Sequence, residues 1–98
     1  MPTASELTSL AHRAHEDLKS WSSFVALTEF VWQDSGVVSN ARRWQAIWFE
    51  MEIVNALALA EWEEQGFPCD WLNRWREEYQ SDAQTLLSKL FCLIVRQE

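Results

Sequence analysis

Residues 39–68 read SNARRWQAIWFEMEIVNALALAEWEEQGFP, and this stretch predicts one long helix with a marked beginning and a marked end. Ser39 or Asn40 can cap the first turn, because a short polar side chain accepts hydrogen bonds from the free amides there. Gly66 supplies the left-handed residue that commonly follows a helix, Phe67 the next apolar contact, and Pro68 blocks continuation. We therefore expect a helix from residue 39 or 40 to residue 65.

On a helical wheel this segment has two opposed apolar faces, separated by narrow polar seams. The first face holds Trp44, Ile47, Trp48, Met51, Val54, Ala58, Leu59 and Trp62, and the second holds Ala46, Phe49, Ile53, Ala56, Leu57 and Ala60. A helix at the edge of a bundle needs only one apolar stripe. Two interpretations follow. Either the helix lies between its two neighbours in a flattened arrangement, or one face packs inward and the other meets a second chain.

The segment before it predicts a first helix from Thr3 to Asp34. Thr3 and Glu6 form a capping box, and apolar residues then recur at alternating spacings of four and three. Gly36 is the expected stop. The serines at positions 20, 22 and 23 can kink or split this helix, because their hydroxyls compete for backbone hydrogen bonds.

The segment after it predicts a third helix from residues 68–70 almost to the end of the chain. Ser81 and Asp82 could cap a separate last helix, but the apolar spacing continues through them. A connection of about three residues at Gly66 makes the second and third helices antiparallel. We therefore expect an all-α fold, in which residues 1–98 form a single domain: a compact antiparallel bundle of three long helices, one of which can be broken to give four.

Seven tryptophans in 98 residues favour a surface that docks on another protein, because a short chain cannot easily enclose seven indoles and tryptophan is enriched at interfaces. Pairs at i, i+4 make broad rigid patches. The predicted partner-binding residues are Trp44, Trp48, Phe49, Ile53, Leu57, Trp71 and Trp75.

The end of the third helix adds a second reason to expect a partner. Its apolar residues cover an arc of roughly 200° on the wheel, which is wider than one bundle seam requires. They are Leu86, Leu87, Leu90, Phe91, Leu93, Ile94 and Val95. Self-association would remove such a surface from water.

The formal net charge of −7 favours a basic partner and disfavours nucleic acid and anionic membrane surfaces. Acidic residues near the predicted end of the second helix would steer that partner. They are Glu61, Glu63, Glu64, Glu77 and Glu78.

The sequence contains no pattern that indicates catalysis, a metal site or a cofactor. His12 and His15 are one helical turn apart but have no third ligand beside them, and we interpret them as part of a solvated charged face. Cys69 and Cys92 have apolar neighbours and are expected to be buried, reduced thiols, which favours the cytoplasm. Neither a secretion signal nor a membrane-spanning run is visible.

These observations predict a small acidic non-enzymatic protein-binding module of the inhibitor, immunity, adaptor or assembly-chaperone type. The first alternative is an obligate homodimeric structural protein that uses the second face of the middle helix and the end of the third. The second alternative is a metal-dependent helical enzyme that uses the two histidines or the glutamates.

Overall fold

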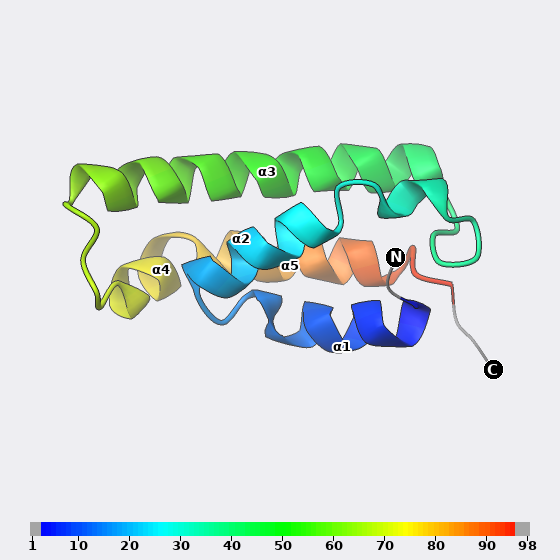
Figure 1. Cartoon of the computed structure of the whole chain (residues 1–98), viewed down its shortest axis with the longest axis horizontal. Helices are drawn as coiled ribbons and strands as arrows, with labels where there is room; N and C mark the ends of the chain where they lie inside the picture. Colours follow the sequence, from blue (N-terminus) through cyan, green and yellow to red (C-terminus); the bar gives the residue numbers. More distant parts are fainter. Residues whose placement is uncertain (1–2, 96–98) are drawn as a thin grey trace.

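In a computed structural model, which describes residues 3–95, the chain is a bundle of five α-helices and one short 3₁₀ helix. The elements are α1 (Ala4–Ala14), α2 (Leu18–Leu27), η1 (Val31–Gln33), α3 (Ala41–Glu64), α4 (Leu72–Glu78) and α5 (Gln80–Phe91). Successive long segments run in opposite directions, as Figure 1 shows. The all-α class is therefore confirmed, but three long helices are not: the first and third predicted helices are both broken.

The first predicted helix ends at Ala14 because Asp17 starts a new one. The Asp17 carboxylate accepts a hydrogen bond from the Ser20 amide at 2.7 Å, which caps α2. The Thr28 hydroxyl then donates to the Phe24 carbonyl at the last turn of α2. The break therefore lies at the aspartate, upstream of the serines that were expected to cause it.

The third helix was predicted to be continuous, but it is interrupted at Tyr79, two residues before the possible Ser81–Asp82 cap. Tyr79 has φ −118° and ψ −29°, and no side chain caps α5 at this point. Its ring stacks on both Trp71 and Trp75, with centroids 5.8 and 5.9 Å apart. Aromatic packing thus accompanies the change of direction between α4 and α5.

The middle helix, α3, has the predicted limits. The Asn40 side chain accepts a hydrogen bond from the Arg43 amide at 3.1 Å. At the other end the amides of Gly66 and Phe67 donate to the carbonyls of Glu63 and Trp62, which is the Schellman pattern. The Phe67 and Trp62 rings pack edge to face with their centroids 4.9 Å apart, which supplies the accompanying apolar contact.

The arrangement of the helices answers the question that the two faces of α3 raised. Figure 1 shows α3 along one edge of an elongated bundle, while α2, η1 and α5 pack against a single flank of it. The flattened arrangement, in which α3 lies between its neighbours, is therefore wrong. One face of α3 belongs to the core, and the other has no neighbour among residues 3–95.

The apolar end of α5 is used inside the monomer. Leu86, Leu87, Leu90 and Leu93 are buried, and Phe91 and Ile94 pack against the core. A short antiparallel bridge joins Val38 to Ile94, and the Val95 amide donates to the Val37 carbonyl at 2.7 Å. The wide apolar arc is therefore no reason to expect a partner at this end, because α1, α3 and the segment before α3 have their apolar faces on the same core.

Candidate docking surface

The outer face of α3 carries an uncovered apolar row. We call it the outer stripe; it consists of Ala46, Phe49, Ile53, Ala56, Leu57 and Ala60, all of which are exposed. Its three large side chains are 62% (Phe49), 46% (Ile53) and 59% (Leu57) exposed. They follow one another at intervals of four residues, so they form a continuous ridge along the helix.

The outer stripe contributes nothing to the core of the monomer. The opposite face of the same helix already buries Trp44, Ile47, Met51 and Ala58, and Asn55 is buried among them. Scattered single apolar residues are ordinary on a protein surface, but an aligned group on one rigid helix is typical of an interaction site. The second face that the wheel predicted is therefore present and uncovered in the monomer.

The charged residues near the outer stripe differ in sign at its two ends. Arg42 and Arg43 are exposed in the first turn of α3, while Glu63 and Glu64 are exposed in its last turn. Glu50 is exposed beside the middle of the stripe. A partner that lies along the helix would therefore meet positive charge at one end and negative charge at the other.

Trp44, Trp71 and Trp75 are buried, so their assignment to a partner-binding surface is wrong. Trp48 is half-buried, packs against the core and donates its Nε1–H to the Val25 carbonyl at 2.9 Å. Trp75 donates in the same way to the His15 carbonyl at 2.9 Å. For Trp48 and Trp75, the fold places the indole N–H against a backbone carbonyl of another segment, which removes the penalty for burying that donor.

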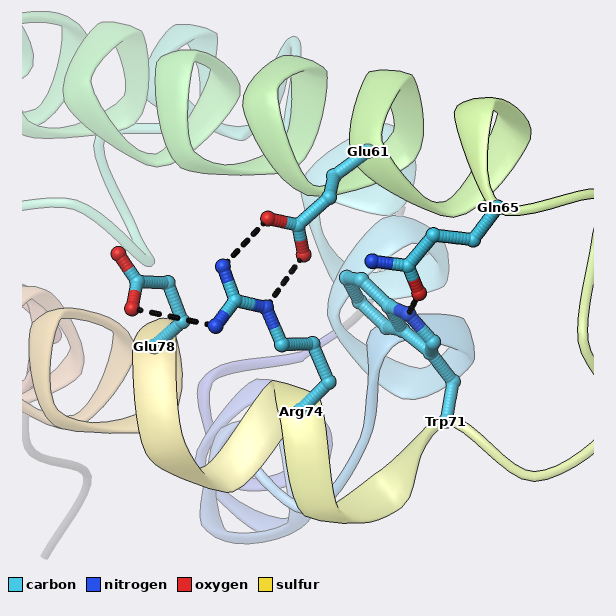
Figure 2. Close-up of polar contacts among 5 residues, drawn as sticks. All are labelled: Glu61, Gln65, Trp71, Arg74 and Glu78. Carbon is cyan, nitrogen blue, oxygen red and sulfur yellow. Dashed lines mark hydrogen bonds and ion pairs between the residues drawn. The ribbon is translucent and has the colours of Figure 1, made fainter.

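The acidic residues predicted to steer a partner divide into two groups. Figure 2 shows Arg74 of α4 between Glu61 of α3 and Glu78. Its guanidinium donates to the two Glu61 carboxylate oxygens at 2.6 and 2.7 Å, and its Nη1 lies 3.6 Å from Glu78. Glu61 is therefore compensated inside the fold, while Glu78 shares the same guanidinium at longer range and is 52% exposed. Glu63, Glu64 and Glu77 are exposed and form no ion pair within residues 3–95.

The Arg74 contacts change the acidity of the groups around them. The hydrogen bonds from Arg74, followed by its charge, hold the pKa of Glu61 below its ordinary value. The same pair raises the pKa of Arg74. Burial raises the pKa of Tyr79, and the nearby Glu61 carboxylate raises it further. This network joins α3 to α4 and is structural.

A second apolar feature, a hollow of about 640 Å³, lies where the end of α3, the start of α4 and the start of α2 meet. Its lining includes Leu18, Leu59, Trp62, Phe67, Trp71 and Leu72. The exposed Phe67 at this hollow has φ 56°, in the left-handed region that side chains disfavour. The sequence predicted Phe67 only as part of the helix stop, and the Gly66-Phe67-Pro68 turn is the one signal that could have pointed to it.

The described residues contain no cluster suited to a metal ion: within residues 3–95, no group of three His, Cys, Asp or Glu side chains converges. His12 is exposed and lies against Phe91, with ring centroids 5.1 Å apart, while the His15 carbonyl accepts the Trp75 and Gln80 side chains. Cys69 and Cys92 are free and exposed, so the prediction that both thiols are buried is wrong.

Comparison with other proteins gives no family for this chain: no protein-family model, curated protein or solved structure matches it. Across residues 3–95, no helix has both the length and the apolar composition needed to cross a membrane.

Proposed function

We propose that this chain is a non-enzymatic protein-interaction module that docks through the outer stripe of α3. One observation carries the proposal: Phe49, Ile53 and Leu57 remain about half exposed or more on a helix whose other face packs against the core. The proposal keeps the protein-binding role that the sequence predicted but moves it from the tryptophans to the opposite side of the helix.

The outer stripe supplies enough apolar surface to drive association with a complementary groove or helix. Complete burial of a large apolar side chain is worth about 1.5–3 kcal/mol. Since the three large side chains of the stripe are already about half covered, docking gains roughly 2–5 kcal/mol from them. Such a gain is sufficient for a helix that binds in an apolar groove of its partner. The flanking charges then contribute to the orientation of the partner more than to the affinity.

The charge distribution favours a partner whose surface carries basic residues where it faces the end of α3. The net charge of −7 and the uncompensated Glu63 and Glu64 favour positive charge on a partner near the end of α3. Arg42 and Arg43 are too few against this background to favour nucleic acid. The two free, exposed cysteines fit a reducing cytoplasm as the place of action.

Site-specific photo-cross-linking tests the proposal. Benzoylphenylalanine replaces Phe49 in one version of the chain and Phe30 in another, and both are irradiated in the cells that produce the protein. Phe30 is the matched control, because it is 58% exposed but lies between α2 and η1. We expect a discrete adduct from position 49 that is absent from position 30 and is lost when Ile53→Glu is added. No adduct at position 49, or the same adducts at both positions, would overturn the proposal.

A further inference from the structure

We propose that the occupant of the outer stripe is a second copy of this chain, packed antiparallel to the first across a two-fold axis that passes beside Ile53. This inference rests on the proposed function, since it names the partner of the same surface. It also differs from the obligate dimer that the sequence suggested, because the end of α5 takes no part in it.

The residues of α3 are arranged symmetrically about Ile53. Phe49 and Leu57 stand four positions on either side of it, and both are large, apolar and exposed. Ala46 and Ala60 stand seven positions away, and both are small and exposed. Position by position the stripe therefore matches itself in both directions, with one exception: Ala56, three positions after Ile53, has the exposed Glu50 as its counterpart three positions before it.

Charged residues of opposite sign stand at equal distances from Ile53 at the two ends of the stripe. Arg42 and Glu64 stand eleven positions on either side of Ile53, and both are exposed. Eleven residues make just over three turns of an α-helix, so Arg42, Ile53 and Glu64 lie nearly on one line. A second α3 laid antiparallel would bring each Arg42 to the Glu64 of the other copy. A parallel pair would place arginine against arginine and glutamate against glutamate.

A two-fold pair of this kind uses the same patch on both subunits, which is the commonest form of homodimer. In the antiparallel register Ile53 meets its own symmetry mate, and each Phe49 meets a Leu57. The alanines that stand between and beyond these positions let the helix axes approach closely. Phe49 thus faces Leu57 and Ala46 faces Ala60, while the exposed Glu50 faces Ala56, so the helices can pack along about 33 Å of their length.

The size of the surface predicts a reversible dimer. Each copy contributes one helix face with three large side chains, which is at the small end of specific protein interfaces. We therefore expect a dissociation constant on the order of 10–100 µM. The net charge of −7 on each copy acts against association and keeps the dimer in this weak range.

Sedimentation velocity of the purified chain from 5 to 500 µM tests the inference directly. We expect a fast monomer–dimer equilibrium that is lost in Ile53→Glu, which would place two carboxylates at the two-fold axis. Phe30→Glu is the control, since it adds the same charge at an exposed apolar side chain outside the stripe. Unchanged helical circular dichroism shows that each variant is folded. A chain that stays monomeric at every concentration overturns the inference.

Charge reversals test the antiparallel register. Arg42→Glu and Glu64→Arg should each weaken the dimer about tenfold, because each turns both end pairs from attractive to repulsive. The double variant R42E/E64R should return to within about threefold of the natural chain, since it restores both pairs. Arg76→Glu on α4, which changes the net charge as much as Arg42→Glu, should have a smaller effect than that variant.

Glu64→Arg is the decisive variant because it makes the net charge of each copy less negative. If general repulsion alone governs association, this variant dimerises more tightly; if the antiparallel register is right, it dimerises more weakly. Tighter dimerisation overturns the register.

The two proposals can fail separately. The dimer is refuted, and the docking function is retained, by two results together. The purified chain stays monomeric, and the cross-linked adduct from position 49 has a mass that differs from twice the chain mass. No adduct and no dimer refutes both.

Discussion

At the scale of single residues, most tryptophans of this protein form hydrogen bonds that hold parts of the chain together. Indole N–H groups of Trp21, Trp48, Trp62 and Trp75 donate to the backbone carbonyls of Met51, Val25, Pro68 and His15 respectively, and Trp71 donates to the Gln65 side chain. The bonds of Trp21, Trp48 and Trp75 join residues 30, 23 and 60 positions apart, while those of Trp62 and Trp71 span six residues around the turn after α3. A high tryptophan content is therefore weak evidence for an interface when the helices can offer carbonyl groups to the rings.

Trp44 is the exception, and it leads to a prediction. Its ring is fully buried, but within residues 3–95 its Nε1–H has no hydrogen-bond partner. Trp75 is equally buried and makes a 2.9 Å bond. Trp44→Phe and Trp75→Phe remove the same ring volume, but only the second also removes a satisfied hydrogen bond.

We therefore expect Trp44→Phe to lower the free energy of unfolding by about 1–3 kcal/mol less than Trp75→Phe does, because it also removes an unpaired buried donor. Urea denaturation followed by circular dichroism measures both values. Equal losses of unfolding free energy in the two variants would show that the unpaired Trp44 N–H does not destabilise the folded protein.

At the scale of elements, the helix ends made by local chemistry were predictable, and those made by packing were not. The Asn40 cap and the Gly66-Phe67-Pro68 stop are short sequence signals, and both limits of α3 follow from them. The break at Tyr79 has no side-chain cap; its accompanying contact is stacking on Trp71 and Trp75, which depends on the tertiary fold. The break at Asp17 was predictable in principle, since aspartate is a common cap, but the apolar spacing that runs through it hid the signal.

The end of α3 provides a test of the Schellman stop. Gly66 has φ 81°, and a Cβ at this position would meet no atom within 4 Å. Gly66→Ala therefore creates no clash, and its effect comes from the left-handed backbone alone. We expect a loss of about 1 kcal/mol in the free energy of unfolding.

Gly66→Asn is the matched variant, because asparagine tolerates this backbone conformation better and should lose less than half as much. Urea midpoints at constant m-value give the comparison. An alanine variant as stable as the natural chain would contradict the role of Gly66 as the stop.

The ion pair between α3 and α4 makes stability depend on pH in a defined direction. The pKa of Glu61 is lowered in the folded state from its ordinary value of 4.5, chiefly by hydrogen bonds from Arg74. The unfolded chain therefore binds the proton more readily, so the stabilisation is complete above pH 4.5 and is lost as the pH falls through the lower, folded pKa.

We expect Glu61→Gln to be less stable than the natural chain at pH 7, with a difference that narrows steadily as the pH falls below 4.5. Urea midpoints measured from pH 7 to pH 3 check this. Glu63→Gln is the control, because Glu63 is exposed and makes no ion pair within residues 3–95. A Glu61→Gln difference that stays constant with pH would contradict the role of the carboxylate charge.

At the scale of the whole molecule, the sequence showed that α3 has two apolar faces but could not show which is the core. The wheel places Trp44 and Phe49 on opposite sides with similar apolar character. What separates them is the position of α2, η1 and α5 on the Trp44 side, a tertiary arrangement that local patterns do not encode. For the same reason the partner-binding prediction mixed core residues with the surface ones.

The exposed stripe has a consequence for thermal stability that belongs to the assembled protein. A dimer that forms only from folded chains stabilises them by mass action, so the midpoint of thermal unfolding should rise with chain concentration. With a dissociation constant on the order of 100 µM, raising the concentration from about 5 to about 500 µM adds roughly 1 kcal/mol. For a domain of this size that shift corresponds to about 4–8 °C.

Ile53→Glu should keep the low-concentration midpoint, because the side chain lies on the surface, and should abolish the rise because it disrupts the stripe. Phe30→Glu should keep both the midpoint and the rise. Differential scanning calorimetry at several concentrations measures these midpoints for the three chains. If the unfolding midpoint of the natural chain does not change with concentration, two copies of α3 do not pack against each other. The exposed outer stripe would then have to bind a different protein.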